Sequence, residues 1–300
     1  MSALVVEAQA PAKANLFLRV LGREADGYHA IETLFCRLDL ADTVRAERRE
    51  GHDVTLAVSG GETGPPEENL ALRAARAVLG SLEQRFAVHL TLTKRIPVGA
   101  GLGGGSADAA AALLAVNRLA GDAIPRHELL QIAARLGSDV PFCLSGGPLA
   151  IGWGRGERML RLPGLPAAPA LLLAPPIAIS TAEAYRWVDQ ARESAGRRGA
   201  LALELDALSR WGDIARMAGN DFESAVFAHH PEIRSAFEAL VGTHPLLCRM
   251  SGSGSCLLAI YRTARDREDA QLRLGRKHGS LVAAETLAHP VPGAEVVGTG

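Results

Sequence analysis

Short runs of alternating apolar and polar residues characterise the N-terminal part of the chain. Residues 3–8 and 15–22 alternate valine, leucine and phenylalanine with polar neighbours, which predicts two strands joined by a tight turn at residues 10–14. Residues 32–50 and 53–60 predict a second pair of strands. We therefore expect the chain to begin as a β-sheet.

Further along the first half of the chain, the apolar residues recur at the spacing of helices. Residues 69–86 carry apolar side chains at helical intervals, and Asn69 is in position to cap the first turn. Residues 106–121, which are rich in alanine, and residues 125–144 predict two consecutive helices, of which the second ends near Gly137. Helices therefore join the sheet within the first half of the chain.

The pattern of a new sheet restarts in the second half. The expected elements are a strand at 168–180, helices within 181–242 with a break at 196–199, a glycine turn and buried strand at 249–262, a helix at 267–279 and a strand at 281–288. Strands and helices alternate irregularly, so an α+β fold is favoured over a doubly wound sheet. We expect two domains, residues 1–155 and 156–300.

Composition narrows the class of partner. Hydrophobic residues make up 48% of the 300 residues and charged residues 22%, as in folded globular proteins. The formal net charge is −1, from 32 basic and 33 acidic side chains, and no basic stripe is visible. Nucleic acid therefore has no electrostatic footprint, and we expect a small-molecule substrate. The oligomeric state is left open.

The cysteine pattern and the length of the apolar runs indicate the cellular compartment of the protein. The four cysteines are scattered without a CxxC pair, which predicts neither a disulfide framework nor a zinc site. No apolar run reaches the roughly 18 residues of a membrane span, and the N-terminus lacks the pattern of a secretory signal. We expect a cytoplasmic protein without a membrane partner.

The segment PVGAGLGGGSA at residues 97–107 lies between an alternating strand at 86–97 and the alanine-rich helix. Gly99, Gly101 and Gly104 match the G-x-G-x-x-G pattern of dinucleotide sites. That fold needs a second strand that carries an acid, whereas here two helices follow. No GxxxxGK[ST] is present either, so both common nucleotide motifs are excluded.

Two readings of this loop stay open on the residues alone. Glycines let the backbone approach a ligand, and amides at a helix start beside Ser106 attract an anion such as phosphate. The alternative is a flexible glycine turn before an alanine helix. Five glycines between a strand and a helix start favour the phosphate site.

Three segments together resemble the GHMP kinases, which phosphorylate galactose, homoserine, mevalonate and phosphomevalonate. The glycine loop resembles the second motif of the family, residues 10–35 the first, and residues 249–261 the third. The similarity runs from Pro11 to Tyr261 in the expected order. The segments PAKANLFLRVLG, DGYH, GLGGGSADAAAAL and LGSDVPFCLSGG are most similar to the branch whose acceptor carries a cytidyl group.

The resemblance implies a two-domain α+β kinase with ATP and substrate in the cleft between the domains. The implied reaction is ATP-dependent phosphorylation of the 2-hydroxyl of 4-diphosphocytidyl-2-C-methyl-D-erythritol, in the non-mevalonate route to isoprenoids. By the same resemblance Lys13 and Asp139 are the catalytic pair. We expect Asp139 to take the hydroxyl proton late in phosphoryl transfer, while Lys13 holds the carboxylate and the attacking oxygen.

The remaining site residues also follow from the resemblance. Asn69, Leu70 and Lys94 would lie near the adenosine, Tyr28 and Tyr185 would sandwich the cytosine ring, His29 would hydrogen-bond its edge, and Asn15 and Thr181 would line the substrate cleft. The expected cradle of the ATP phosphates consists of Pro97, Val98, Gly99, Ala100, Gly101, Leu102, Gly103, Gly104, Gly105, Ser106 and Ala107.

A magnesium ion is expected with ATP, but the sequence offers no carboxylate cage for it. Ser106 and Asp108 lie closest to the phosphate loop, and the metal ligands are left open.

The residue types leave alternatives. Lys13 also fits a solvated turn lysine, Asp139 a helix cap within residues 137–142, and Tyr28 and Tyr185 core aromatics. A homoserine or mevalonate kinase and a regulator that only binds nucleotide are the competing functions. Tyr28 favours an acceptor with a base, and the presence of both Lys13 and Asp139 favours catalysis.

Overall fold

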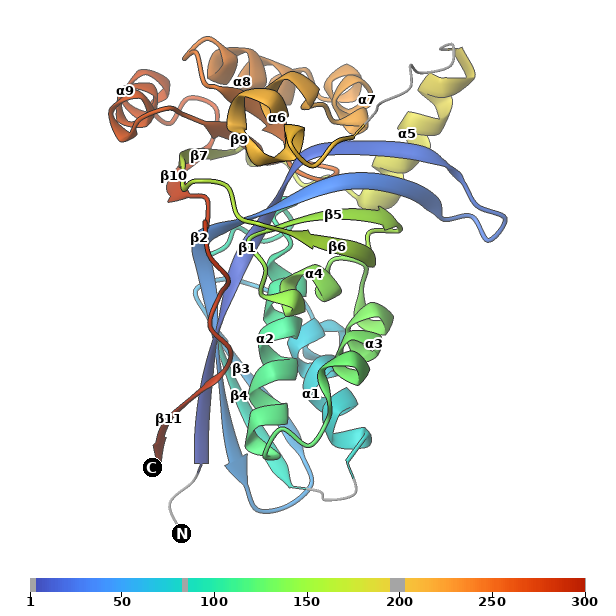
Figure 1. Ribbon diagram of the computed structural model, residues 1–300, viewed down its shortest axis with the longest axis vertical. Helices are drawn as coiled ribbons and strands as arrows, with labels where there is room; N and C mark the ends of the chain where they lie inside the picture. The colour runs from blue at the N-terminus through green and yellow to red at the C-terminus, as the bar shows by residue number, and fades with distance from the viewer. Residues whose placement is uncertain (1–3, 83–85, 195–202, 300) are drawn as a thin grey trace.

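The computed structural model describes residues 4–82, 86–194 and 203–299 (Figure 1). Its described strands form a seven-stranded and a four-stranded sheet. The larger sheet contains β1 (Leu4–Arg23), β2 (His29–Arg49), β3 (Val54–Ser59), β4 (Ala87–Thr93), β5 (Leu149–Gly154), β6 (Arg158–Leu162) and β11 (Glu295–Thr299). The smaller one has the order β10 (Ser280–Glu285), β7 (Pro169–Ala174), β9 (Leu257–Ile260), β8 (Leu247–Met250). With helices packed on both, the fold is α+β, as expected.

The N-terminal strand runs through both halves of the molecule. The prediction of two strands with a turn at residues 10–14 is wrong, because β1 continues through Pro11 and pairs with β2 along its length. The register shifts between Pro11 and Lys13, and a shift of this kind accommodates a proline that cannot donate to the ladder. In Figure 1 this β1–β2 hairpin extends from the larger sheet to the helices at the other end.

The expected pairing of residues 32–50 with 53–60 is also wrong. β2 pairs antiparallel with β4, and β3 pairs parallel with β4 at the edge of the sheet. The side chains of β3 are mostly exposed, with Val58 at 38%, whereas β4 alternates buried and half-buried positions. The more apolar β4 therefore takes the inner place beside β2.

Helices α1 (Leu70–Gly80), α2 (Gly104–Leu119), α3 (Arg126–Leu136) and α4 (Val140–Ser145) pack on one face of the larger sheet (Figure 1). The small side chains of Ala109 to Ala112 are fully buried, so α2 lies close to the strands and to α1. Asn69 caps α1 by accepting from the backbone N–H of Ala71, and α3 ends before Gly137, as predicted. The glycine loop thus leads into a helix whose middle turns are buried.

The second half surrounds the smaller sheet with helices. They are α5 (Thr181–Ser194), α6 (Trp211–Met217), α7 (Asp221–His229), α8 (Pro231–Val241) and α9 (Ala264–Leu274). Short 3₁₀ turns lie at Pro66–Glu68 in the first half and at Ala207–Ser209 in the second. The expected break at residues 196–199 lies outside the described residues. Within the described ranges, none of the helices is both long and apolar enough to cross a lipid bilayer.

The chain passes from the larger sheet to the smaller one between Leu162, at the end of β6, and Pro169, at the start of β7. At its C-terminal end the chain returns to the larger sheet, where β11 pairs with β1. The division at residue 155 stays a prediction, and we propose that the structural boundary follows β6. The long β1–β2 hairpin contacts both sheets and places the first motif between the two halves.

Candidate active site

The glycine loop has a backbone that few other residues adopt. Gly99, Gly101 and Gly103 have φ angles of 71°, 76° and 66°. A Cβ on Gly101 would lie 2.3 Å from the carbonyl oxygen of Ser251, and one on Gly103 would lie 2.7 Å from Cγ of Lys13. Glycine is therefore required at both positions by conformation and by contact.

Segments from both ends of the chain hold the loop. Ser251 Oγ donates to the carbonyl oxygen of Gly101 at 2.9 Å, and the N–H of Cys256 donates to that of Ala100 at 3.2 Å. The N–H of Lys13 donates to the carbonyl oxygen of Leu102 at 2.9 Å. The third glycine-rich segment thus packs against the loop, and hydrogen bonds from both ends of the chain hold the loop in place.

Lys13 and Asp139 meet in an ion pair. Nζ of Lys13 lies 3.0 Å from Oδ2 of Asp139 and donates to Oδ1 of Asn15 at 2.9 Å. Asn15 in turn donates from Nδ2 to Thr33 Oγ1 at 2.7 Å. Lys13 is only 4% exposed, so it is not a solvated turn lysine. Asp139 precedes α4 without a side-chain capping bond, and it lines the larger cavity.

A second lysine lies under the other side of the loop. Lys94 Nζ bonds Oδ2 of Asp42 and, at 2.7 Å, Oδ2 of Asp108. Burial raises the pKa of Asp108 to about 7, against the opposing effect of the Lys94 charge. Oδ1 of Asp108 is buried without a hydrogen-bond partner among the described residues. This enclosed group fixes the strand before the loop, because Asp42 Oδ1 also accepts from the N–H of Ile96.

Two adjoining cavities share the loop. The smaller, of about 320 Å³, is lined by the loop together with Asn69, Leu70 and Lys94. The larger, of about 1000 Å³, contains Lys13, Asp139 and the other candidates of the first motif. Gly101, Gly103 and Ser106 line both cavities. A ligand that fills the smaller cavity would therefore come close, at the glycine loop, to a ligand in the larger cavity.

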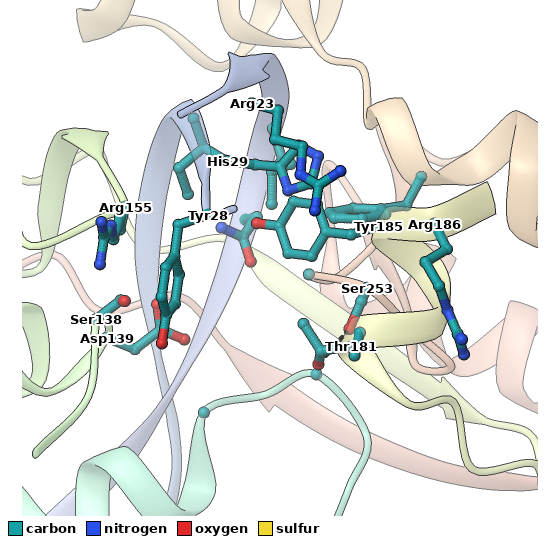
Figure 2. Close-up of a pocket in the computed structure, with 18 of the residues that line it drawn as sticks. Arg23, Tyr28, His29, Ser138, Asp139, Arg155, Thr181, Tyr185, Arg186 and Ser253 are labelled. Atoms are coloured by element: carbon teal, nitrogen blue, oxygen red, sulfur yellow. Dashed lines mark hydrogen bonds between the residues drawn. The ribbon is translucent and has the colours of Figure 1, made fainter. Parts of the chain in front are cut away.

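Tyr28 stands at the rim of the larger cavity. Its side chain is 59% exposed, so it is not a core aromatic. The guanidinium of Arg155, from the turn between β5 and β6, lies 3.9 Å from the ring centroid and forms ion pairs with Glu24 and Asp26. Figure 2 shows Arg155 on one side of Tyr28, and His29 and Tyr185 on the other. One face of this ring is thus held, and the other faces the cleft.

His29 and Tyr185 form the opposite wall. Their rings stack at 4.5 Å with an angle of 14° between the planes (Figure 2). Nε2 of His29 lies 2.8 Å from Oδ1 of Asp189. Burial, helped by the charge of Asp139, raises the pKa of Tyr185 to about 12, so its hydroxyl stays neutral. Next to them, Thr181 Oγ1 and Ser253 Oγ lie 3.0 Å apart.

The structure therefore brings the expected residues to one place. The larger cavity holds Lys13, Asn15, Tyr28, His29, Asp139, Thr181 and Tyr185, and the smaller one Asn69, Leu70, Lys94 and Pro97 to Ser106. Ala107 is buried behind the loop, in the first turns of α2. A carboxylate and an ammonium beside a glycine loop can receive a proton and neutralise phosphoryl oxygens.

Comparisons with known proteins agree with this geometry. Residues 69–147 match the GHMP kinases N terminal domain and residues 202–281 match the GHMP kinases C terminal family. The 4-diphosphocytidyl-2-C-methyl-D-erythritol kinase of Solibacter usitatus is 42% identical over 85% of this chain and 80% of the relative. That of Bordetella parapertussis is 39% identical over 96% and 92%. The chain belongs to the 4-diphosphocytidyl-2-C-methyl-D-erythritol kinase family of GHMP kinases.

Solved structures extend the comparison. A crystal structure of 4-(cytidine 5'-diphospho)-2C-methyl-D-erythritol kinase has a TM-score of 0.77 at 35% identity and covers 93% of this chain and 98% of that one. A homoserine kinase from Cytophaga hutchinsonii has a TM-score of 0.72 at 19% identity and covers 99% and 98%. The second similarity shows the fold alone. The fold class and the GHMP kinase membership expected from the sequence are confirmed.

Sequence reasoning about this GHMP kinase missed several residues of the site. Arg155 and Asp189 escaped notice, although Asp189 follows Tyr185 by four positions and therefore lies on the same face of α5. Asp42 carried no local signal, because it is 52 residues from its partner Lys94. Phe222 packs edge-on against Tyr185, and only the fold brings α7 to this wall.

Proposed function

We propose that this GHMP kinase transfers the γ-phosphoryl group of ATP to the 2-hydroxyl of 4-diphosphocytidyl-2-C-methyl-D-erythritol, which gives the 2-phosphate and ADP. The observation that carries the proposal is the Lys13–Asp139 ion pair, located where the two cavities meet at the glycine loop. Relatives that match most of the chain have the name of this activity. A regulator that only binds nucleotide would not need this pair.

ATP occupies the smaller cavity in this proposal. Asn69 and Leu70 lie beside the adenosine, and the loop from Pro97 to Ala107 surrounds the phosphates. The backbone N–H groups in the first turn of α2 have no partner within the helix, and they carry partial positive charge toward a bound anion. Lys94 supports the loop through its ion pairs with the buried carboxylates of Asp42 and Asp108. The main task of the smaller cavity and its glycine loop is thus to position the γ-phosphoryl group.

The acceptor hydroxyl lies at Asp139. As the oxygen–phosphorus bond forms, the hydroxyl proton passes to a carboxylate oxygen of Asp139, and ADP leaves with the bonding electrons. Lys13 orients that carboxylate at 3.0 Å, and its charge stabilises the phosphoryl oxygens. Asn15 keeps the Lys13 ammonium in place through its 2.9 Å bond. Proton removal and charge neutralisation therefore occur at adjacent atoms.

A magnesium ion would accompany ATP. Among the described residues, no three or more His, Cys, Asp or Glu side chains are grouped so that they could hold a metal. Ser106, which lines both cavities, would supply the hydroxyl ligand. Asp108 does not fit this role, because its carboxylate is bonded to Lys94 and 3% exposed. When bound, the ion neutralises charge on the phosphates.

The cytidyl end of the acceptor occupies the larger cavity. Tyr28 offers one free ring face, and Tyr185 with His29 forms the other wall, so a flat base fits between them. Thr181 and Asn15 line the path from this wall toward Asp139. Homoserine and mevalonate have no base for these rings. The aromatic walls thus favour the cytidyl acceptor over the rival substrates of the fold.

ADP release by the purified protein tests the proposal. With ATP and Mg²⁺ we expect turnover of 4-diphosphocytidyl-2-C-methyl-D-erythritol and none above background with homoserine or mevalonate. The product should carry a phosphate monoester on the tertiary oxygen, seen by phosphorus NMR. Turnover of homoserine or mevalonate in preference to the cytidyl compound would overturn the proposal. The cytoplasmic location stays a prediction.

A further inference from the structure

One ring nitrogen of His29 is held by a carboxylate that no motif includes. Nε2 lies 2.8 Å from Oδ1 of Asp189, and the imidazole is 7% exposed. An ionised carboxylate only accepts hydrogen bonds, so Nε2 carries the hydrogen. In the neutral ring the second nitrogen, Nδ1, is then an acceptor. Within the described residues no hydrogen bond to Nδ1 is found, which leaves it for a ligand.

Helix α5 fixes both the hydrogen and the plane of this ring. Tyr185 and Asp189 are four residues apart, and they present their side chains to His29 from adjacent turns. The His29 ring is parallel to Tyr185 to within 14°. A base that meets Nδ1 edge to edge therefore lies in the imidazole plane and parallel to the tyrosine. Hydrogen bonding to His29 and stacking between Tyr185 and Tyr28 are thus compatible.

The tautomer decides which pyrimidine this edge accepts. Cytosine has an exocyclic amino group, which donates hydrogen bonds, where uracil has a carbonyl oxygen, which accepts them. When Nδ1 is an acceptor, it can accept a hydrogen bond from the amino group of cytosine, but it repels the carbonyl oxygen of uracil, which is also an acceptor. A hydrogen on Nδ1 would reverse this preference. The side chain that places the hydrogen on Nε2 therefore determines the selectivity.

We propose that Asp189 is a positioning residue that makes the site select cytosine over uracil. It holds His29 as the Nε2–H tautomer, so that Nδ1 accepts a hydrogen from the exocyclic amino group of the base. Asp189 also lines the larger cavity, and in this proposal it acts on the base through His29. The inference rests on the proposed function, because it takes His29 to face the base, and its two experiments separate the two claims.

The first experiment is independent of activity. Nitrogen NMR of the histidine rings in the ¹⁵N-labelled full-length protein, with His29 assigned by its loss in His29→Asn, distinguishes the two neutral tautomers from the imidazolium. We expect a protonated Nε2 and a bare Nδ1, and loss of this fixed tautomer in Asp189→Ala. A hydrogen on Nδ1 in the unmodified protein, as the other tautomer or the imidazolium, would overturn the inference.

The second experiment compares kcat/KM for the cytidyl substrate and its uridyl counterpart. In Asp189→Ala the ratio should fall by about tenfold, as expected for one hydrogen bond to a ligand, with the KM for ATP unchanged. Asp189→Glu, which keeps a carboxylate acceptor, should restore most of the ratio. Glu183→Ala is the control on the same helix, because Glu183 does not line the larger cavity; it removes an exposed ion pair with Arg186, which does line it.

The outcomes are separable. A general structural defect would lower turnover of both substrates and raise the KM for ATP, and the ratio would not change. If the unmodified protein turns over the cytidyl compound and Asp189→Ala keeps the ratio, the inference fails and the function stands. If the unmodified protein does not turn over the cytidyl compound, the function fails, and the NMR experiment alone decides the tautomer.

Discussion

Two lysine–aspartate groups flank the same glycine loop and differ in what reaches their carboxylates. Lys13 pairs with Asp139, whose side chain is 28% exposed at the junction of the cavities. Lys94 pairs with Asp42 and Asp108, whose side chains are 0% and 3% exposed. An added Cβ on Gly103 would meet Lys13, and one on Gly104 would lie 3.3 Å from Nζ of Lys94. Consecutive loop residues thus lie against the two lysines.

The difference shows how one kind of ion pair serves two purposes. A carboxylate at a cleft can exchange a proton with a substrate, whereas an enclosed one can only hold what surrounds it. We therefore assign the chemistry to Lys13 and Asp139, and the rigidity of the loop to Lys94 and its partners. This division can be tested by changing each group separately.

The largest expected effect is on stability. Lys94→Met leaves Asp42 and Asp108 buried together without a cation, so the free energy of unfolding should fall by about 3 to 5 kcal/mol. Urea unfolding measures this, with Lys277→Met as a control at an exposed position. Equal stability of the two variants would show that the buried group does not hold the loop region.

A smaller effect is expected at the rim of the cleft. Tyr28→Ala removes one stacking face, so the affinity for the cytidyl substrate should fall by about tenfold or more, with that for ATP unchanged. Tyr28→Phe keeps the ring and should bind like the original. Titration calorimetry with each ligand provides the check. A parallel loss of both affinities would make this tyrosine structural despite its exposure.

The smallest effect concerns the pH dependence of stability. Because burial raises the pKa of Asp108 from 3.8 to about 7, its contribution to stability is present at low pH and is lost as pH rises through about 7. Asp108→Asn keeps an acceptor for Lys94 without this titration. Its stability relative to the unmodified protein should therefore rise by about 1 kcal/mol or more between about pH 5 and pH 8.

Unfolding in urea at several pH values measures the difference between Asp108→Asn and the unmodified protein. A difference that stays constant with pH would contradict the assignment of a raised pKa to this carboxyl. A difference that moves against the variant as pH rises would mean that folding lowers the pKa of Asp108, so that its ionised form stabilises the protein.

Local pattern was sufficient for some of the molecule. The glycine loop, the alanine-rich α2, the Asn69 cap and the end of α3 before Gly137 all depend on neighbours within a few residues, and the sequence predicts them. Pro11 looked like the end of a strand, because only the pairing with β2 shows that a register shift absorbs it. Turn residues are therefore ambiguous where a long strand carries an irregularity.

The residues of the site also fall into those that the sequence predicts and those that only the fold shows. Lys13, Asp139, Tyr28 and His29 belong to recognisable motifs, and the structure brings them to one cleft. The residues that hold them come from distant segments. Arg155 stacks on Tyr28 from the turn after β5, and Asp189 reaches His29 across 160 residues. The fold fixes both partners. Arg155 has no short-range signal, whereas the spacing of four residues between Tyr185 and Asp189 on α5 is a local one.

The assignment of the chemistry to the Lys13–Asp139 pair is tested most directly by a single turnover of Asp139→Asn with both substrates already bound. The amide keeps a hydrogen-bond acceptor for Lys13 but cannot take the hydroxyl proton. The account predicts that the rate of phosphoryl transfer falls by at least ~100-fold, with substrate affinities and stability nearly unchanged. Transfer at the rate of the unmodified protein would contradict it.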